Sequence, residues 1–350
     1  MDQRFVELKN WLEGELPSFD GFKCDEWQLL PVSGDASFRR YFRALSGGCS
    51  WIAVDAPPEK ENSRPFVAVA KTLEQQGVHV PHVYLADYEL GFMLLSDLGD
   101  NLYLPQLNAD SVDVLYGAAL DELLKIQACD AVSGMALPSY DEALLSREME
   151  LFRDWFLSQL LGLSLGEEEN KLLDCFFSSL VKSALEQNQV FVHRDYHSRN
   201  LMYQHEGSPG VIDFQDAVRG PVTYDLVSLL RDCYIAWPDE QVYGWVEGYR
   251  KQLLNHGLNV PDEGVFQSWF DLMGTQRHLK AIGIFARLNI RDGKSGYLQD
   301  IPRTFSYMQT VASKTPELSA VAEWLDSEVV PHMYSSGIWS DTELDQWVRR

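Results

Sequence analysis

The stretch from residue 190 to residue 214 constrains the fold of this chain most strongly. Three short apolar runs, at 190–192, 201–203 and 210–214, lie there between polar residues, whereas the rest of the second half shows mainly the apolar spacing of helices. Short runs of this kind predict strands that flank a polar loop. Because loops held by rigid elements often carry binding and catalytic residues, we expect the function to lie in this stretch.

The polar loop contains the pattern HxDxxxxN, formed by His193, Asp195 and Asn200. Asp213 follows near the end of the apolar run at 210–214. Phosphoryl transfer from a nucleotide needs a carboxylate that accepts the proton of the attacking hydroxyl, and oxygen ligands for magnesium. We therefore predict Asp195 as the base and Asn200 and Asp213 as the metal ligands. The alternative is a chance match in which Asp195 caps a turn, and the flanking strands argue against it.

The first hundred residues show a different pattern. A helix is expected at 5–17, strands at 27–32, 40–45 and 51–54, a helix at 64–76, and strands at 80–85 and 92–95. Later helices are expected at 111–128, 141–160, 167–187, 222–235, 239–255, 262–290 and 317–328. The chain is thus predicted to be α+β, with a small β-rich lobe over residues 1–97 and a larger, mainly helical lobe over residues 98–350.

Composition limits the class of protein. The formal net charge is −23, which argues against a nucleic-acid partner and against an anionic membrane surface. The five cysteines include no CxxC pair, as expected of free thiols in a reducing compartment. The sequence shows no secretory signal and no apolar run long enough to span a bilayer, so we expect a cytoplasmic protein with no membrane partner.

The loop motif and the acid after it resemble the aminoglycoside phosphotransferase and choline kinase family, over about residues 20–290. The resemblance implies a bilobal protein-kinase-like fold, ATP and Mg²⁺ as cofactors, and a small-molecule acceptor that carries a hydroxyl. It also implies structural roles for His193 and Asp225. In that family the acid at the position of Asp225 braces the catalytic loop and does not react.

Three further segments, at 33–43, 55–60 and 283–287, resemble one bacterial branch of this family. Its members phosphorylate the anomeric C1 hydroxyl of N-acetylmuramate and N-acetylglucosamine in peptidoglycan recycling, so the implied acceptor is an amino sugar. Two alternatives stay open. One is a kinase for an aminoglycoside, a choline-like compound or an amino alcohol, and the other is a nucleotide-binding module without turnover.

The turn between the first two strands is expected to cover the nucleotide phosphates with its backbone N–H groups. It holds a single glycine, so it is not a GxGxxG loop. The predicted contacts are Ser33, Gly34, Asp35, Ala36, Ser37 and Phe38. The adenine is expected against the segment that joins the lobes, through the backbone of Ser96 and Leu98.

The usual lysine of the third strand is missing. Asp55 stands at the expected position, and the place of the partner glutamate falls near Phe66. Another cation should then meet the phosphates, and Arg39, Arg40 and Arg43 are the nearest. Strand alternation places Arg40 on the opposite face from the other two, and we predict Arg40 as the phosphate contact.

The acceptor pocket is expected beside Asp195, where a basic stretch at 276–291 contributes side chains. The candidate acceptor contacts are His197, Arg199, Arg277, His278 and Arg287. The alternative for the basic stretch is a solvated face that balances the surrounding acids, and for His278 a packing role.

Overall fold

The computed structural model describes residues 2–32, 38–205 and 207–348. The chain forms two compact units: unit 1 contains Met1–Leu137 and Arg199–Ala217, and unit 2 contains Pro138–Ser198 and Val218–Arg350. The polar loop therefore passes from unit 2 to unit 1 between Ser198 and Arg199. These units differ in extent from the predicted lobes at 1–97 and 98–350, and a lobe boundary near residue 97 stays a prediction.

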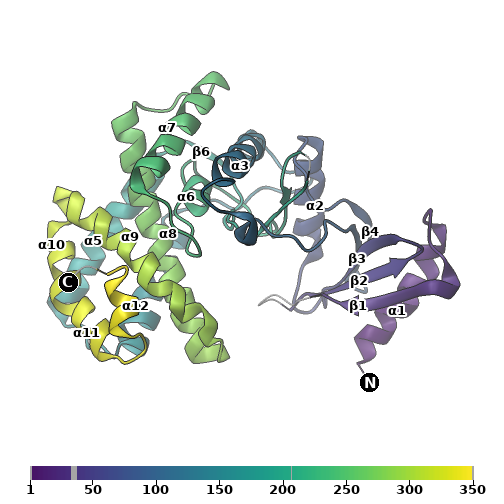
Figure 1. The fold of residues 1–350 in the computed structure, drawn as a ribbon, viewed down its shortest axis with the longest axis horizontal. Coiled ribbons are helices and arrows are strands. Elements are labelled where there is room, and N and C mark those ends of the chain that lie inside the picture. The colour runs from purple at the N-terminus through teal and green to yellow at the C-terminus, as the bar shows by residue number, and fades with distance from the viewer. Residues whose placement is uncertain (1, 33–37, 206, 349–350) are drawn as a thin grey trace. The chain divides into compact units, whose positions relative to one another are not determined.

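Unit 1 is built on an antiparallel sheet in the order β1-β2-β3-β5-β4 (Figure 1). Its strands are β1 (Trp27–Pro31), β2 (Arg40–Ser46), β3 (Cys49–Asp55), β4 (Val83–Asp87) and β5 (Phe92–Ser96). All neighbouring pairs are antiparallel. The meander predicted from the short apolar runs is confirmed, with boundaries shifted by up to three residues.

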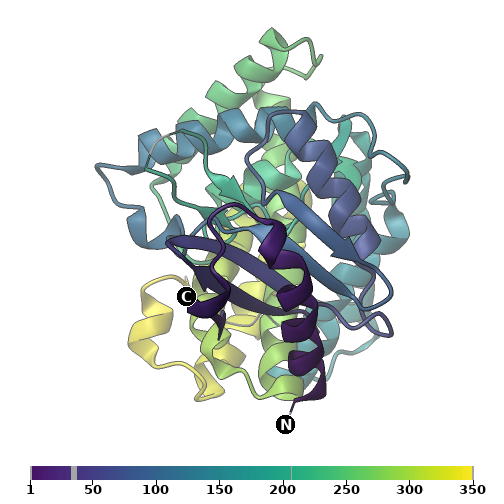
Figure 2. The ribbon, with the colours of Figure 1, turned by 90° about the vertical axis from the view of Figure 1, so that its right-hand side faces the viewer.

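Helix α1 (Gln3–Glu15) packs along one face of this sheet, as Figures 1 and 2 show from two directions. Its buried Leu8 and Leu12 contact Phe42 of β2 and Trp51 of β3 in a single apolar cluster. Each fully buried leucine contributes about 1.5–3 kcal/mol to stability. The helix begins at an Asp2 N-cap, whose side chain accepts a hydrogen bond from Phe5 N–H. The cluster determines which side chains of β2 and β3 face α1.

The remaining elements of unit 1 come from two distant parts of the chain. They are α2 (Ser63–Gln75), α3 (Val112–Gln127), and the short paired strands β7 (Leu201–Met202) and β8 (Gly210–Val211). Helix α2 begins at an Asn62 cap and buries Phe66. The hairpin β7–β8 carries the end of the polar loop into this unit, because Tyr103 N–H donates to the carbonyl of Leu201 (2.8 Å).

Unit 2 is mainly helical. Its elements are α4 (Glu142–Leu151), a π-helical segment (Phe152–Leu160), α5 (Glu167–Glu186), β6 (Gln189–Val192), β9 (Val218–Pro221), α6 (Tyr224–Leu230), α7 (Asp239–Asn255), α8 (Glu263–Asp292), α9 (Ile301–Lys314), α10 (Ser319–Trp324), α11 (Val330–Ser335) and α12 (Asp341–Asp345). No helix of the described ranges has both the length and the apolar character that a membrane span requires.

Four elements of unit 2 were not predicted, namely β9, α9, α11 and α12. Strand β9 contains Gly220 and Pro221, which are typical of turns, yet it pairs with β6. A Cβ at Gly220 would lie 2.9 Å from Cβ of Tyr140, so this glycine allows a close approach and does not mark a turn. Among the missed helices, α9 has proline at its second position, a site that a helix tolerates.

Helix α8 lies unusually close to the end of α4. A Cβ placed on Gly283 would lie 2.3 Å from the carbonyl carbon of Leu151, so only glycine fits there. Glu148 precedes Leu151 by three residues and Lys280 precedes Gly283 by three, and these two side chains form an ion pair (3.3 Å). The close approach at Gly283 thus brings two charged groups together one turn away.

Replacing Gly283 with alanine should destabilise unit 2. The added methyl group meets backbone, which cannot move aside as a flexible side chain can, and overpacking of this kind costs about 1–3 kcal/mol. Gly248→Ala on α7 is the matched control, because a Cβ there meets nothing within 4 Å and alanine favours the helix by up to about 1 kcal/mol. Urea unfolding of both variants measures the difference. Equal stability of the two would contradict the packing described here.

Candidate active site

The polar loop begins in unit 2 directly after β6, and Asp225 of α6 fixes its backbone. The carboxylate of Asp225 accepts hydrogen bonds from the N–H groups of His193 (2.7 Å) and Arg194 (3.0 Å). Arg194 has a φ of 78°, a left-handed conformation that is costly for a bulky residue and persists only where its surroundings enforce it. Asp195, the predicted base, follows this constrained residue.

His193 is fully buried at the start of the same loop. Its Nδ1 accepts a hydrogen bond from Asp195 N–H (3.3 Å), and its ring packs edge-on against Tyr196. Both contacts stay within the loop. The structural roles expected of His193 and Asp225 rest on these geometries and stay predictions.

A second buried acid, Asp232, holds the end of the loop segment in unit 2. Its carboxylate accepts hydrogen bonds from the N–H (3.0 Å) and the hydroxyl (2.5 Å) of Ser198, and also from Tyr234 N–H (3.1 Å). The ring of Tyr234 packs edge-on against His197, with centroids 5.5 Å apart. The segment after α6 is therefore joined to the polar loop by both hydrogen bonds and ring contact.

The side chain of Asp195 lies among positive charges. Burial raises the pKa of this carboxyl, but the nearby charges of Lys280, His197, Arg277 and Arg194 outweigh burial and hold its pKa below the usual value. Asp195 is therefore ionised at neutral pH. An ionised carboxylate is the form that can accept a proton.

Glu148 of α4 organises two of these cations. Its carboxylate pairs with Arg194 (2.5 Å) and Lys280 (3.3 Å), and Tyr140 donates a short hydrogen bond to it. Burial raises the pKa of Glu148, and the two cations more than offset this, so the carboxyl stays ionised. Lys280 also donates to the hydroxyl of Tyr224 (3.1 Å). Glu148 and Lys280 were not among the predicted site residues.

The predicted metal ligands lie in unit 1. Asn200 Nδ2 donates to one oxygen of Asp213 (3.1 Å), and Gln215 Nε2 donates to the other (2.6 Å). Asp213 has a φ of 67°, which an aspartate tolerates better than most residues. Phe214 packs against Phe66 of α2 with tilted rings, their centroids 4.9 Å apart, and so anchors the segment after β8 that carries Asp213.

This group of side chains suits a magnesium ion. Gln215 Oε1 is buried and accepts no hydrogen bond in the described part of the chain, so an oxygen lone pair beside Asp213 is left for a cation or its bound water. The described residues contain no group of three His, Cys, Asp or Glu that could hold a metal. Magnesium usually takes only one or two carboxylates and keeps several waters. Gln215 was not predicted.

The nucleotide-side predictions lie partly outside the described residues, namely Ser33, Gly34, Asp35, Ala36 and Ser37. Phe38 is exposed, and its N–H donates to Glu61 (3.2 Å). Ser96 N–H donates to the carbonyl of His82 (2.9 Å), and the carbonyl of Leu98 accepts from Gln204 Nε2 (3.1 Å). The adenine contacts through Ser96 and Leu98 stay predictions.

The structure shows which face of the sheet Asp55 occupies, and its assignment to the lysine position stays a prediction. Asp55 pairs with Arg40 of β2 and Arg4 of α1 (both 2.5 Å), so its side chain faces α1. Val54 is the residue of β3 on the other face, because side chains alternate along a strand. Arg40, the predicted phosphate contact, also pairs with Asp2 of the α1 cap. Its guanidinium thus lies on the α1 side of the sheet.

The predicted acceptor residues fall into three places. His197 and Arg277 lie near enough to Asp195 to lower its pKa. His278 is buried, its Nε2 lies 2.9 Å from the carbonyl oxygen of Arg231, and burial lowers its pKa to about 3, so its imidazole is neutral at neutral pH. Arg287 is half-buried further along α8, and Arg199 is exposed in unit 1.

Comparison with known proteins identifies the family. Residues 28–260 match the model of the phosphotransferase enzyme family, and the chain belongs to it. A structure of Plasmodium vivax ethanolamine kinase aligns with a TM-score of 0.60 at 11% identity, over 91% of this chain and 89% of that one. The predicted α+β, protein-kinase-like fold class is therefore confirmed.

Sequence relatives narrow the class of enzyme. An N-acetylmuramate/N-acetylglucosamine kinase of Pseudomonas aeruginosa is 47% identical over 335 residues, which cover 93% of this chain and 97% of the relative. A kinase with the same name from Neisseria meningitidis is 41% identical over 91% of this chain and 93% of its own length. This chain is accordingly an ATP-dependent kinase.

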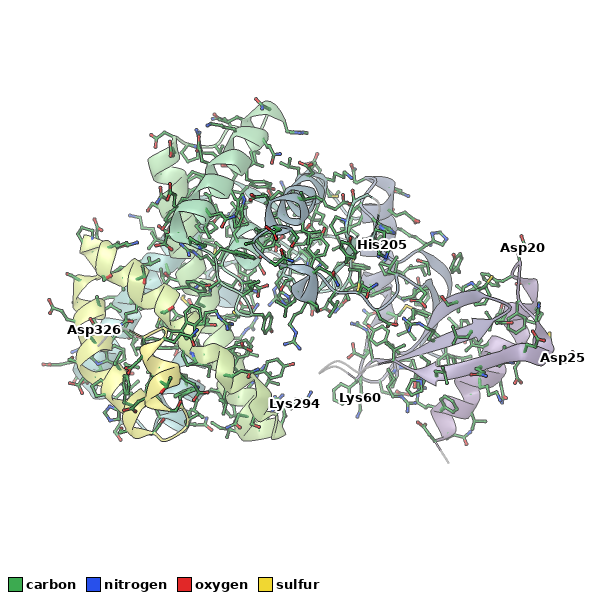
Figure 3. All side chains as sticks on the ribbon, viewed as in Figure 1. Asp20, Asp25, Lys60, His205, Lys294 and Asp326 are labelled. Carbon is green, nitrogen blue, oxygen red and sulfur yellow. The ribbon has the colours of Figure 1, made fainter. Side chains whose placement is uncertain are left out.

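Protonation of the Asp225 carboxylate should lower the activity of the enzyme on the acid side of its pH–rate profile. Burial raises the pKa of Asp225 to about 7, opposed by the two backbone N–H donors. Below pH 7 one oxygen gains a proton and accepts less well, so the loop loosens and kcat should fall as the pH drops. Asp225→Asn should have a low kcat at every pH, and Asp25→Asn, at an exposed acid of unit 1, should behave as the wild type (Figure 3).

The raised pKa of Asp225 also determines whether its contribution to folding stability rises or falls with pH. Because the pKa of Asp225 in the folded state lies above the ordinary value of 3.8, this group stabilises the folded state most below about pH 4, and the contribution is lost as the pH rises through 7. The stability of the wild type relative to Asp225→Asn should therefore decrease between pH 5 and pH 8. A difference that is constant with pH would contradict the assignment.

Removing the charge of Lys280 should shift the pH dependence of the enzyme's activity, because this charge acts on Asp195. In Lys280→Met the burial of Asp195 is no longer offset by this charge, so the pKa of Asp195 rises and the acid limb of kcat/KM moves to higher pH. Lys280→Arg keeps the charge and should restore most of the profile. If the acid limb of kcat/KM were unchanged in Lys280→Met, the charge of Lys280 would not act on Asp195.

Proposed function

We propose that this enzyme transfers the γ-phosphoryl group of ATP to the C1 hydroxyl of N-acetylmuramate and N-acetylglucosamine. The observation that carries the proposal is the ionised carboxylate of Asp195, held on a fixed loop among four groups that lower its pKa. The names of the sequence relatives support the choice of acceptor. Because ATP is a cytoplasmic cosubstrate, we place the reaction in the cytoplasm.

Asp195 acts as the general base. It accepts the proton of the C1 hydroxyl while the hydroxyl oxygen forms a bond to the γ-phosphorus. The bond between that phosphorus and the β,γ-bridging oxygen breaks, and ADP leaves with the electron pair. An anomeric hydroxyl is more acidic than the other hydroxyls of a sugar, so a carboxylate is a base of adequate strength.

Asn200 and Asp213, with Gln215 beside them, would hold the magnesium ion. When bound, the ion neutralises the negative charge of the phosphates. Asp213 presents its two oxygens from the segment that follows β8, and the buried Oε1 of Gln215 supplies a further acceptor for a metal-bound water. These residues belong to the same continuous stretch of chain as Asp195, beginning five residues after it.

The surroundings of Asp195 favour an uncharged or anionic acceptor. Arg194, Lys280 and Arg277 bring permanent positive charge to this part of unit 2, and the one carboxylate of α4 there, Glu148, is already engaged by two of them. The carboxylate of N-acetylmuramate suits such an environment. A cationic aminoglycoside or choline-like compound would need free carboxylates to bind it.

Aromatic rings beside the base suit a sugar. The half-buried ring of Tyr234 contacts His197 and lies 6.4 Å from the ring of Phe285, which stacks on Tyr297 (5.4 Å). We propose that the apolar face of the pyranose or its acetamido methyl group packs against Tyr234, as aromatic side chains combine a large apolar area with a polar end.

A panel of acceptors tests the proposal. ADP release should follow N-acetylmuramate and N-acetylglucosamine, and should stay at background with kanamycin and choline. Asp195→Asn should lower kcat by about 10²–10⁴ because its amide cannot accept the proton, while Mg-ATP still binds.

Turnover of kanamycin or choline without turnover of either sugar would contradict this proposal and indicate a kinase for an aminoglycoside or an amino alcohol. Binding of ATP with no acceptor phosphorylated would favour a nucleotide-binding module. Full activity of Asp195→Asn would remove Asp195 from the role of base.

A further inference from the structure

Two adjacent arginines at the start of β2 point to opposite sides of the sheet. Arg40 pairs with Asp55 and with the α1 cap residue Asp2. Arg39 instead lies 3.1 Å from Glu61, and its guanidinium carbon is 6.0 Å from the ring centroid of Phe66 on α2. The cation on the α2 side is therefore Arg39.

The contacts of Arg39 lead to the predicted metal ligand. Phe66, over which Arg39 lies, packs against Phe214 with ring centroids 4.9 Å apart, and Phe214 directly follows Asp213. All of these residues belong to unit 1. Only the Phe66–Phe214 pair therefore separates Arg39 from the segment after β8 that carries Asp213, where a bound nucleotide would place its phosphates.

The side chain of Arg39 is held firmly. It is buried, with 7% of its surface exposed, and the side chain of its partner Glu61 is 15% exposed. Glu61 also accepts the N–H of Phe38 (3.2 Å), and Lys60, labelled in Figure 3, places its ammonium 4.3 Å from the ring centroid of Phe38. The start of β2 and the segment before α2 are tied together by these contacts.

A buried ion pair is costly to form and is weak evidence of a purely stabilising role. An arginine fixed by a carboxylate is, however, well suited to phosphate. The guanidinium carries five N–H donors in a fork, so it can bind a carboxylate and a phosphate at once. Phe66 stands near the position expected of the partner glutamate, so an acid elsewhere must orient the cation.

We propose that Arg39, oriented by Glu61, binds the α- and β-phosphates of the nucleotide in place of the missing strand lysine. This inference rests on the proposed phosphotransfer function, and it differs from the sequence-based choice of Arg40. It assigns the phosphate contact to the residue before β2 and the orienting acid to the segment before α2.

Nucleotide binding without any acceptor tests this inference. Calorimetry should measure the affinities for Mg-ADP and for adenosine in Arg39→Met, Arg39→Lys and Glu61→Gln. Arg64→Gln is the matched control, because Arg64 is an exposed arginine on α2 whose guanidinium lies over Tyr88. The melting temperature of each variant shows that it is folded.

Arg39→Met should weaken Mg-ADP binding about 10- to 100-fold, the loss expected for hydrogen bonds to a charged group, with the affinity for adenosine unchanged. Arg39→Lys should lose less, and Arg64→Gln should bind both ligands as the wild type does. Glu61→Gln should weaken Mg-ADP binding while leaving adenosine unaffected.

Three results would overturn the inference: Mg-ADP binding within twofold of wild type in Arg39→Met and Arg39→Lys, an equal loss of adenosine and Mg-ADP binding, or a phosphate-selective loss in Arg40→Met instead. The readout needs no acceptor. If the sugars prove not to be substrates, the proposed function fails while the test of Arg39 still gives its answer.

Discussion

The structure of the site depends on the two hydrogen bonds from the loop backbone to Asp225. They hold His193 and Arg194, including the left-handed φ of Arg194, and so determine where Asp195 points. The Arg194 side chain then reaches Glu148, which also engages Lys280. One buried carboxylate on α6 thus fixes the backbone of the base, and a second on α4 gathers two of the cations that keep the base ionised.

Charge pairing also stabilises the α1 side of the sheet in unit 1. Asp55 is fully buried, and an unpaired charge there would be very costly, but Arg4 and Arg40 compensate it from α1 and β2. Helix α1 therefore covers an apolar cluster and also completes an ionic group at the edge of that cluster. On the opposite side of β2, Arg39 pairs with Glu61, and this pair is the one proposed to meet the phosphates.

Local patterns in the sequence predicted the strands of unit 1, most helices of unit 2 and the residues of the loop motif. They could not predict Glu148, Asp232 or Lys280, because these side chains meet the loop only through tertiary packing from α4, the segment after α6 and α8. Strand alternation separated Arg39 from Arg40 correctly, but the choice of face depended on where α1 packs. The close approach at Gly283, which aligns Lys280 with Glu148, likewise follows from helix packing that no local pattern describes.

The most direct test of the central claim is the position of the phosphate in the product. The enzyme should be incubated with ATP and N-acetylglucosamine, and the product examined by phosphorus–proton correlation NMR. The account predicts a correlation between the phosphorus and the anomeric H1 proton, since Asp195 is proposed to deprotonate the C1 hydroxyl. A correlation with the H6 protons, or no phosphorylated sugar while ATP is consumed with a cationic acceptor, would contradict it.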